Sequence, residues 1–192
     1  MPDTFKELVT SCRSFRRFEE EAVISREELE DLVDHARLTA STANSQALKF
    51  HIIDDKEKCS RIFPYLKWAA ALKDWDGPVP GERPSAYILV LCDQTLGKNK
   101  MWDEGITSQT IMLAATAKGY GGCMIGSCQR AEILKECGLD AERYTLGLVL
   151  ALGKPNEDVR IVPVGENGDT TYYRDQDQTH YVPKRSLEDL LV

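Results

Sequence analysis

The sequence predicts an α+β fold, in which helices and a few strands follow one another without a regular alternation. Helix-start patterns occur twice near the N-terminus. Two long apolar runs, residues 86–92 and 144–152, have the composition of buried strands. With 192 residues and no internal repeat, the chain is predicted to form a single domain, 1–192, of ordinary size.

The N-terminal part of the chain is predicted to contain two capped helices. Thr4 and Glu7 have the spacing of a capping box, so the first helix is expected to begin at Thr4 and to end before the basic cluster that follows. Ser25 and Glu28 repeat this pattern. Apolar residues at helical spacing then continue the second helix to Ala40.

The next segments mix short elements with loops. Residues 50–53 are expected to form a strand, which the following acidic pair ends. Residues 58–73 have a helical pattern that Pro64 interrupts. Residues 76–84 are rich in Pro and Gly and predict a long loop, which leads into the apolar strand 86–92.

The second half of the chain repeats the mixture. Residues 102–118 predict a long helix, which Gly119 closes at its C-terminal end. Residues 121–127 form a glycine-rich segment with apolar residues inside it. A short helix over 131–137 and the apolar strand 144–152 follow.

Composition excludes several classes of function. The formal net charge of −7 disfavours a nucleic-acid partner, and no apolar run reaches the roughly 18 residues of a membrane helix. The first residues show no signal-peptide pattern, so we expect a cytoplasmic protein. The six cysteines include no CxxC pair, which disfavours a metal site, and reduced thiols are expected.

Two tight basic clusters stand at opposite ends of this acidic chain. The first is Arg13-Ser14-Phe15-Arg16-Arg17 and the second is Lys184-Arg185. Arg presents a planar fork of donors that matches phosphate oxygens, Lys adds a point charge, and Ser adds a hydroxyl group. Both clusters therefore favour a phosphate ligand.

Between the clusters lies an uncharged polar segment, Ser41-Thr42-Ala43-Asn44-Ser45-Gln46. Its amide side chains can donate to and accept from the edge of a polar heterocycle. A phosphate at one end and a flat polar ring at the other describe a mononucleotide such as a flavin. Because the chain lacks the G-x-G-x-x-G fingerprint of a dinucleotide site, FMN is expected rather than FAD.

Four segments, in order, resemble motifs of the nitroreductase family of FMN-dependent oxidoreductases, and the similarity spans nearly the full chain. Residues 13–16 resemble the family's R-S-x-R phosphate motif, and residues 41–46 resemble its S-x-x-N-x-Q segment along the flavin. Residues 121–127 resemble the glycine-rich stretch whose backbone approaches the isoalloxazine ring. Lys184-Arg185 stands where the family has its C-terminal phosphate ligands, whereas Cys12 stands where a second Arg is frequent.

The resemblance implies a nitroreductase-like central mixed or antiparallel sheet flanked by helices, and an intertwined homodimer with FMN at the interface. It implies that NADH or NADPH delivers a hydride to flavin N5, after which a nitroaromatic, a quinone or a similar planar acceptor is reduced in the same place. The protein then needs no catalytic acid or nucleophile of its own. The helix 102–118 is the expected interface element, with the side chains Ile106, Ile111, Leu113, Ala114 and Ala117 on its buried surface.

The motifs and residue types together give a set of expected FMN contacts. They are Arg13, Ser14, Arg16, Ser41, Ala43, Asn44, Gln46, Ile125, Gly126, Lys184 and Arg185. Gly126 is singled out because a residue without a side chain lets the backbone come close to the ring. A planar acceptor stacks on aromatic rings, and the candidates for that pocket are Tyr65, Trp68 and Trp75.

Each motif also has a plainer interpretation. The N-terminal cluster is compatible with a charged surface turn, residues 41–46 with a helix exit, and Gly121-Gly122 with a tight turn. Two other functions stay open. One is a flavin-binding protein without substantial turnover, which serves storage or regulation. The other is a cysteine-dependent enzyme without flavin, although no base is placed beside a cysteine.

Overall fold

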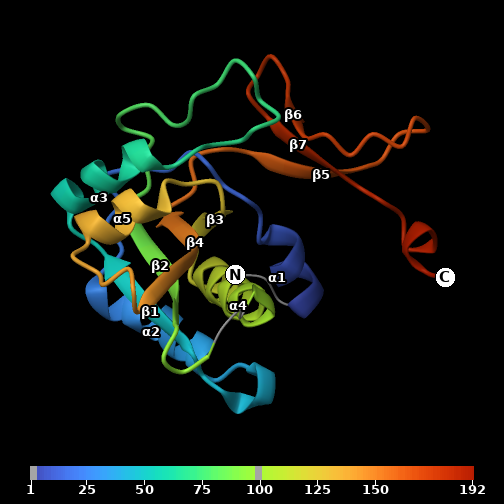
Figure 1. Cartoon of the computed structure of the whole chain (residues 1–192). Coiled ribbons are helices and arrows are strands. Elements are labelled where there is room, and N and C mark those ends of the chain that lie inside the picture. Colours follow the sequence, from blue (N-terminus) through green and yellow to red (C-terminus); the bar gives the residue numbers. More distant parts are fainter. Residues whose placement is uncertain (1–3, 98–100) are drawn as a thin grey trace.

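The computed structural model of the chain describes residues 4–97 and 101–192. Its helices are α1 (Phe5–Ser11), α2 (Arg26–Arg37), α3 (Lys56–Ile62), α4 (Met101–Ala117) and α5 (Arg130–Glu136), with 3₁₀ turns at Thr42–Asn44, Phe63–Tyr65 and Glu188–Leu190. Its strands are β1 (Leu48–Ile53), β2 (Ala86–Asp93), β3 (Gly121–Ile125), β4 (Tyr144–Gly153), β5 (Val159–Pro163), β6 (Tyr173–Arg174) and β7 (His180–Lys184). Helices and strands alternate irregularly (Figure 1), and the predicted α+β class is confirmed.

A central antiparallel sheet organises the molecule. Its order among the described strands is β1-β2-β4-β3, and every neighbouring pair in it runs antiparallel. β2 is buried along its whole length, as expected for an apolar strand that is covered on both faces. The predicted strands 50–53, 86–92 and 144–152 all belong to this sheet, and helices flank it as expected.

The two faces of this sheet pack into two separate hydrophobic cores. Ile88 and Val90 pack with α2 and α4, whereas Leu89 and Leu91 pack with α3 and α5. Successive side chains of a strand point to opposite faces, so one apolar strand supplies both cores. Figure 1 shows the two helix pairs on opposite sides of β2 and β4.

Both predicted capping boxes are present. The Thr4 hydroxyl accepts a hydrogen bond from the Glu7 backbone N–H at 3.2 Å, and the Glu7 carboxylate accepts one from Thr4 at 3.0 Å. Ser25 and Glu28 make the same reciprocal pair at the start of α2. The expected length of this helix was wrong, because α2 ends at Arg37 and Ala40 lies beyond it.

The glycine-rich segment is a strand rather than a turn. β3 pairs with β4, with Gly121 opposite Gly153 and Gly122 opposite Leu152. A Cβ added at Gly121 would lie 2.5 Å from the Phe15 ring, and one at Gly122 would lie 2.4 Å from a backbone oxygen. These two glycines are therefore required by close packing inside the protein.

The expected interface face of α4 needs a correction. Ile111 is fully buried in the core formed with α2, so its side chain is not available to a partner. Ile106 stays 43% exposed, and Trp102 at the start of the helix is 76% exposed. The exposed apolar surface of α4 therefore lies near its N-terminal end.

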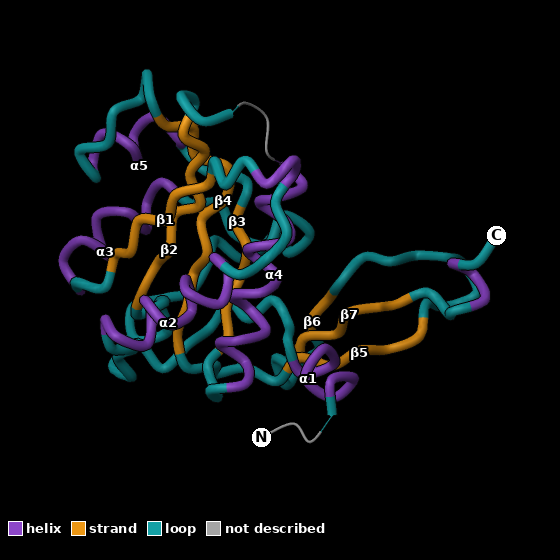
Figure 2. The backbone as a smooth tube through the Cα atoms, turned by 90° about the horizontal axis from the view of Figure 1, so that it is seen from below, coloured by secondary structure: helices purple, strands orange, loops and turns teal. Residues whose placement is uncertain are grey.

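The C-terminal part of the chain forms a second sheet, which the sequence did not predict. Among the described strands, β7 is central in it, pairing in parallel with β5 and antiparallel with β6. Figure 2 shows this sheet beside the main body, with the C-terminal residues running outward from it. Within the described part of the chain, no helix is long and apolar enough to cross a membrane.

Candidate functional site

The N-terminal basic cluster is an extended segment held against the edge of the central sheet. Ser14 forms a parallel bridge with Gly122, and the Phe15 N–H donates to the Gly122 carbonyl at 2.9 Å. The Asn156 N–H donates to the Arg17 carbonyl, also at 2.9 Å. The segment 13–17 is therefore an integral part of the fold and not a free charged turn.

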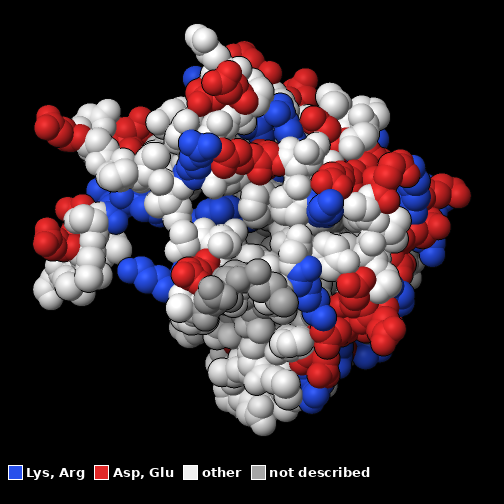
Figure 3. Space-filling view, turned by 180° about the vertical axis from the view of Figure 1, so that it is seen from behind, with Lys and Arg blue, Asp and Glu red and all other residues white. Residues whose placement is uncertain are grey.

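The two basic clusters meet at one cavity of about 380 Å³. Its lining includes Arg13, Ser14 and Arg16 from the N-terminal segment and Lys184 from β7. No carboxylate of the described residues lines it, so its charge is wholly positive. In Figure 3, Lys and Arg side chains border the opening between the body and the C-terminal arm, residues 185–192. A cavity of this charge fits an anionic ligand such as a phosphate ester.

Unsatisfied polar atoms stand around the same cavity. Within the described residues, Arg13 Nε and both ring nitrogens of His180 are buried and have no hydrogen-bond partner. Buried polar groups normally have partners, so these atoms fit the approach of a polar ligand. Burial, together with the nearby charges of Arg16 and Arg174, lowers the pKa of His180 to about 4. The imidazole is therefore neutral at pH 7.

His180 was not among the residues expected from the sequence. It is 1% exposed and stacks on Tyr172, with ring centroids 5.3 Å apart. The run Thr179-His180-Tyr181-Val182 contains three residues that favour strands, which is a weak local signal for β7, but nothing in it indicates which side of the strand faces inward.

A second cavity of about 310 Å³ adjoins the first, because Arg16, Met124 and Tyr172 line both. Its lining contains Ile125, Gly126 and Trp68, which were expected at the ring and at the acceptor pocket. A Cβ built on Gly126 would meet no protein atom closer than 3.6 Å. Internal packing therefore does not require glycine at this position, unlike at Gly121 and Gly122.

The segment 41–46 lies elsewhere. Ser41 and Gln46 line a separate cavity of about 350 Å³ together with Asp103 and Thr107 of α4. On the same helix, Gln109 lines the basic cavity. It stands two positions after Thr107, and residues two positions apart in an α-helix are about 200° apart around its axis. One chain therefore does not bring its own segment 41–46 into the cavity that holds its basic clusters.

Hydrogen bonds to a buried carboxylate shape the segment 41–46. Asp103 accepts from the Ser41 hydroxyl at 2.7 Å, from the Thr42 hydroxyl at 2.6 Å and from the Thr42 N–H at 3.0 Å. Ala43, Asn44 and Gln46 have φ values of 53°, 52° and 48°, in the left-handed region that residues with a side chain rarely adopt. Such strain persists where surrounding contacts enforce it and is common at binding sites.

Three further residues expected at the site, Arg185, Tyr65 and Trp75, line neither the basic cavity nor the second cavity. Arg185 is exposed and does not line the basic cavity, unlike its neighbour Lys184. Tyr65 packs against the core formed with α3 and α5. Trp75 packs against the same core, and the guanidinium of Arg174 lies 4.3 Å from its ring centroid.

Cysteine chemistry has no support in the geometry. Burial raises the pKa of the Cys59 thiol to about 12 and also raises the pKa of Cys123, Cys128 and Cys137. A reactive cysteine needs the opposite shift. Within the described residues no group of acidic, Cys and His side chains has the arrangement of a metal site.

Comparison with known families gives one match that covers most of the chain. The model of the Nitroreductase family matches residues 9–105 and 94–154. A relative from Bacillus subtilis (strain 168), provisionally named NAD(P)H nitroreductase YdgI, is 25% identical over 187 residues. That match covers 80% of this chain and 90% of the relative.

Solved structures show the same fold. A protein of Desulfovibrio desulfuricans, provisionally named a nitroreductase and solved in complex with FMN, has a TM-score of 0.71 and 22% identity, with 100% of this chain and 97% of that chain covered. An FMN-dependent nitroreductase from Clostridium difficile R20291 has a TM-score of 0.64 and 19% identity, with 79% and 87% covered.

Proposed function

Because the chain belongs to the nitroreductase family, we propose that it is an FMN-dependent oxidoreductase that uses NADH or NADPH to reduce a planar acceptor such as a nitroaromatic or a quinone. The observation that carries this proposal is the pair of adjoining cavities. One is lined by cations from both ends of the chain, and the other contains Gly126. A phosphate ester with an attached flat ring matches both in charge and shape.

The residues of the first cavity are proposed to bind the phosphate, and those of the second cavity the ring. Arg13, Arg16 and Lys184 neutralise the phosphate, and the hydroxyl of Ser14 adds a donor. The neutral His180 offers one donor and one acceptor nitrogen to the same ligand. At the second cavity, the bare backbone of Gly126 permits close approach of the ring, with Ile125 beside it.

Bound FMN supplies the redox chemistry, since it accepts a hydride from the nicotinamide and returns reducing equivalents to the acceptor. This chain orients the ring and keeps one face open to donor and acceptor in turn. Trp68 lines the second cavity and offers an aromatic surface for a planar acceptor. No protein acid, nucleophile or metal is required.

We also propose that the active unit is a homodimer. Residues 41–46 line a different cavity from that of the basic clusters, so a second copy of the chain is the proposed source of that segment at each flavin. Exposed apolar side chains support an interface, and they include Phe5, Leu38, Met101, Trp102, Ile106, Leu187, Leu190 and Leu191.

The first test concerns the cofactor and its phosphate. Arg16→Ala removes a charge-assisted contact, so FMN binding should weaken by about 1.5–3 kcal/mol while riboflavin binding stays unchanged. Flavin fluorescence titration of the full-length apoprotein measures both affinities. Lys67→Ala is the matched control, because Lys67 is an exposed cation that lines the second cavity and not the first.

The same preparation tests catalysis. Protein that retains FMN after purification and oxidises NADH or NADPH with an added quinone is the expected result. Bound FMN without steady-state turnover would favour the storage or regulatory alternative. Recovery of FAD, or of a colourless protein that does not take up FMN, would contradict the proposal.

A further inference from the structure

A buried carboxylate that was not among the expected site residues lies beside the N-terminal basic cluster. The side chain of Glu157 is 1% exposed. One of its oxygens accepts hydrogen bonds from the backbone N–H groups of Arg16 and Arg17, the latter at 3.2 Å. The other oxygen accepts from Arg174 Nη2 at 3.0 Å.

The partner of Glu157 is almost as deeply buried. The Arg174 side chain is 7% exposed, and burial lowers its pKa although the charge of Glu157 opposes that shift. Removal of one member of a buried ion pair leaves the other without compensation, so the two residues act as a unit. Because Arg174 balances the charge of Glu157, the pair adds no net negative charge next to the basic cavity.

Contacts of Glu157 and Arg174 link three segments of the chain. The guanidinium groups of Arg174 and Arg17 lie 4.3 Å and 5.9 Å from the ring centroid of Trp75, in the loop before β2. Arg174 itself belongs to β6 of the second sheet. The carboxylate therefore joins the N-terminal segment, the C-terminal sheet and the aromatic loop at one point.

The hydrogen bonds of Glu157 fix the backbone from which Arg16 reaches the cavity. The Arg16 side chain is oriented further by its hydrogen bond to the Ser14 carbonyl at 3.1 Å and by the Tyr172 ring, 5.0 Å away. We propose that Glu157 is a positioning residue for phosphate recognition, which holds Arg16 in the orientation that binds the phosphate of the cofactor. This inference rests on the proposed function.

A purely structural role makes a different prediction. If Glu157 only stabilises the fold, its loss should weaken the binding of any flavin to a similar extent. If it positions Arg16, its loss should affect FMN, which has a phosphate, and spare riboflavin, which lacks one. The ratio of the two affinities therefore separates the two roles.

The test is Glu157→Gln in the full-length apoprotein, titrated with FMN and with riboflavin by flavin fluorescence. The amide keeps the size of the side chain and one acceptor oxygen but loses the charge. We expect the Kd for FMN to rise at least tenfold and the Kd for riboflavin to change less than twofold. In the double variant Glu157→Gln/Arg16→Ala, the two losses should not add, because both act on one contact.

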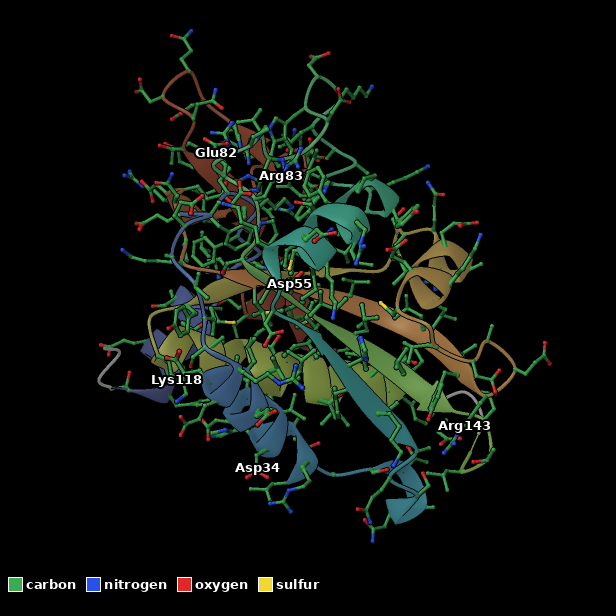
Figure 4. All side chains as sticks on the ribbon, turned by 90° about the vertical axis from the view of Figure 1, so that its left-hand side faces the viewer. Asp34, Asp55, Glu82, Arg83, Lys118 and Arg143 are labelled. Atoms are coloured by element: carbon green, nitrogen blue, oxygen red, sulfur yellow. The ribbon has the colours of Figure 1, made fainter. Side chains whose placement is uncertain are left out.

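Glu82→Gln is the matched control. Glu82 also approaches Arg17, with Arg17 Nε 3.4 Å from its carboxylate, but its side chain is 31% exposed and it accepts no backbone hydrogen bond from Arg16. Figure 4 labels Glu82 next to Arg83, on the side of the molecule where the second sheet lies. Both affinities should stay at the wild-type values in this variant.

Two results would overturn the inference. One is an equal loss of FMN and riboflavin affinity in Glu157→Gln, and the other is no loss of either. If this variant does not fold, Glu157→Gln/Arg174→Met removes both charges and is measured in the same way, with the same outcomes. A wild-type protein that binds neither flavin would contradict the proposed function first, and so the two failures are distinguishable.

Discussion

At the scale of single residues, glycine is needed for different reasons at three nearby positions, 121, 122 and 126. Gly121 and Gly122 are in contact with Phe15 and with a backbone oxygen, at distances that leave no room for a Cβ. Gly126 has room, since the nearest atom would be a Leu148 methyl at 3.6 Å. Internal packing therefore does not explain glycine at position 126, and the proposed close approach of the flavin ring does.

Alanine substitutions test this contrast. In Gly126→Ala the free energy of unfolding without flavin should change by less than about 1 kcal/mol, because the Cβ fits and the unfolded chain loses freedom. FMN and riboflavin should both bind at least tenfold more weakly, since the methyl group occupies the path of the ring.

In Gly122→Ala the free energy of unfolding should fall by about 1–3 kcal/mol. Urea unfolding and flavin titration measure both. Unchanged flavin binding in Gly126→Ala would remove this residue from the site.

His180 gives a pH-dependent prediction. Its pKa in the folded protein is about 4, against 6.5 for an unperturbed histidine, because of burial and the charges of Arg16 and Arg174. The unfolded state therefore binds more protons between these values. The contribution of a neutral His180 to stability is complete above pH 6.5 and is lost as the pH falls toward 4, by up to about 1.4 kcal/mol per pH unit.

Urea unfolding of the flavin-free protein at pH 7.5 and pH 5 measures this effect against His180→Leu. The difference in the free energy of unfolding between the two pH values should be smaller in the variant than in the wild-type protein. His35→Leu is the control, because His35 is exposed on α2. An equal pH dependence in wild-type protein and His180→Leu would show that the imidazole is not desolvated.

At the scale of elements, local signals were sufficient for most of the central sheet and its helices. The capping boxes at Thr4 and Ser25 placed the first two helices, since the signal and the structure it forms lie within three residues of each other. The apolar run 86–92 identified a buried central strand. These elements depend on side chains whose partners are near in the sequence or on burial alone.

The elements that were missed depend on distant partners. β3 contains two glycines, which disfavour strands by themselves, and its partner is β4, which lies beyond α5 in the sequence. β5 and β7 contain Pro163 and Pro183, and their pairing joins residues about twenty apart in parallel. No pattern of neighbouring residues predicts which distant strand such a strand will pair with.

The candidate site was predictable in its parts but not in its layout. The convergence of residues 13–16 and Lys184 on one cavity agrees with the prediction from charge, in which two cationic segments of an acidic chain bind one anionic ligand. The separation of Ser41 and Gln46 from that cavity does not follow from the sequence. It results from α4, which has Asp103 and Gln109 on different sides of its axis.

At the scale of the whole molecule, the C-terminal arm, residues 185–192, has three largely exposed leucines in the part of the chain that the structure describes. The side chains of Leu187, Leu190 and Leu191 are 71%, 64% and 68% exposed. Figure 2 shows this segment extending outward from β7, clear of both sheets. Apolar side chains on an extended arm are stabilised when a second copy covers them, and the arm begins directly after Lys184 of the basic cavity.

Truncation of the arm tests the proposed dimer. The full-length protein loaded with FMN should scatter light with twice the mass of one 21.6 kDa chain. A variant that ends at Ser186 should dissociate at concentrations where the full-length protein stays dimeric, because it has lost the exposed leucines of the arm. Its far-UV circular dichroism should stay close to that of the full-length protein, since α1 to α5 and β1 to β7 all end before residue 187. FMN should be released together with the loss of the dimer, because residues 41–46 of the second copy would no longer reach the flavin.

A full-length, FMN-loaded protein with the mass of one chain would refute the shared site. A truncated protein that stays a stable dimer would exclude the arm as the main contact of the dimer.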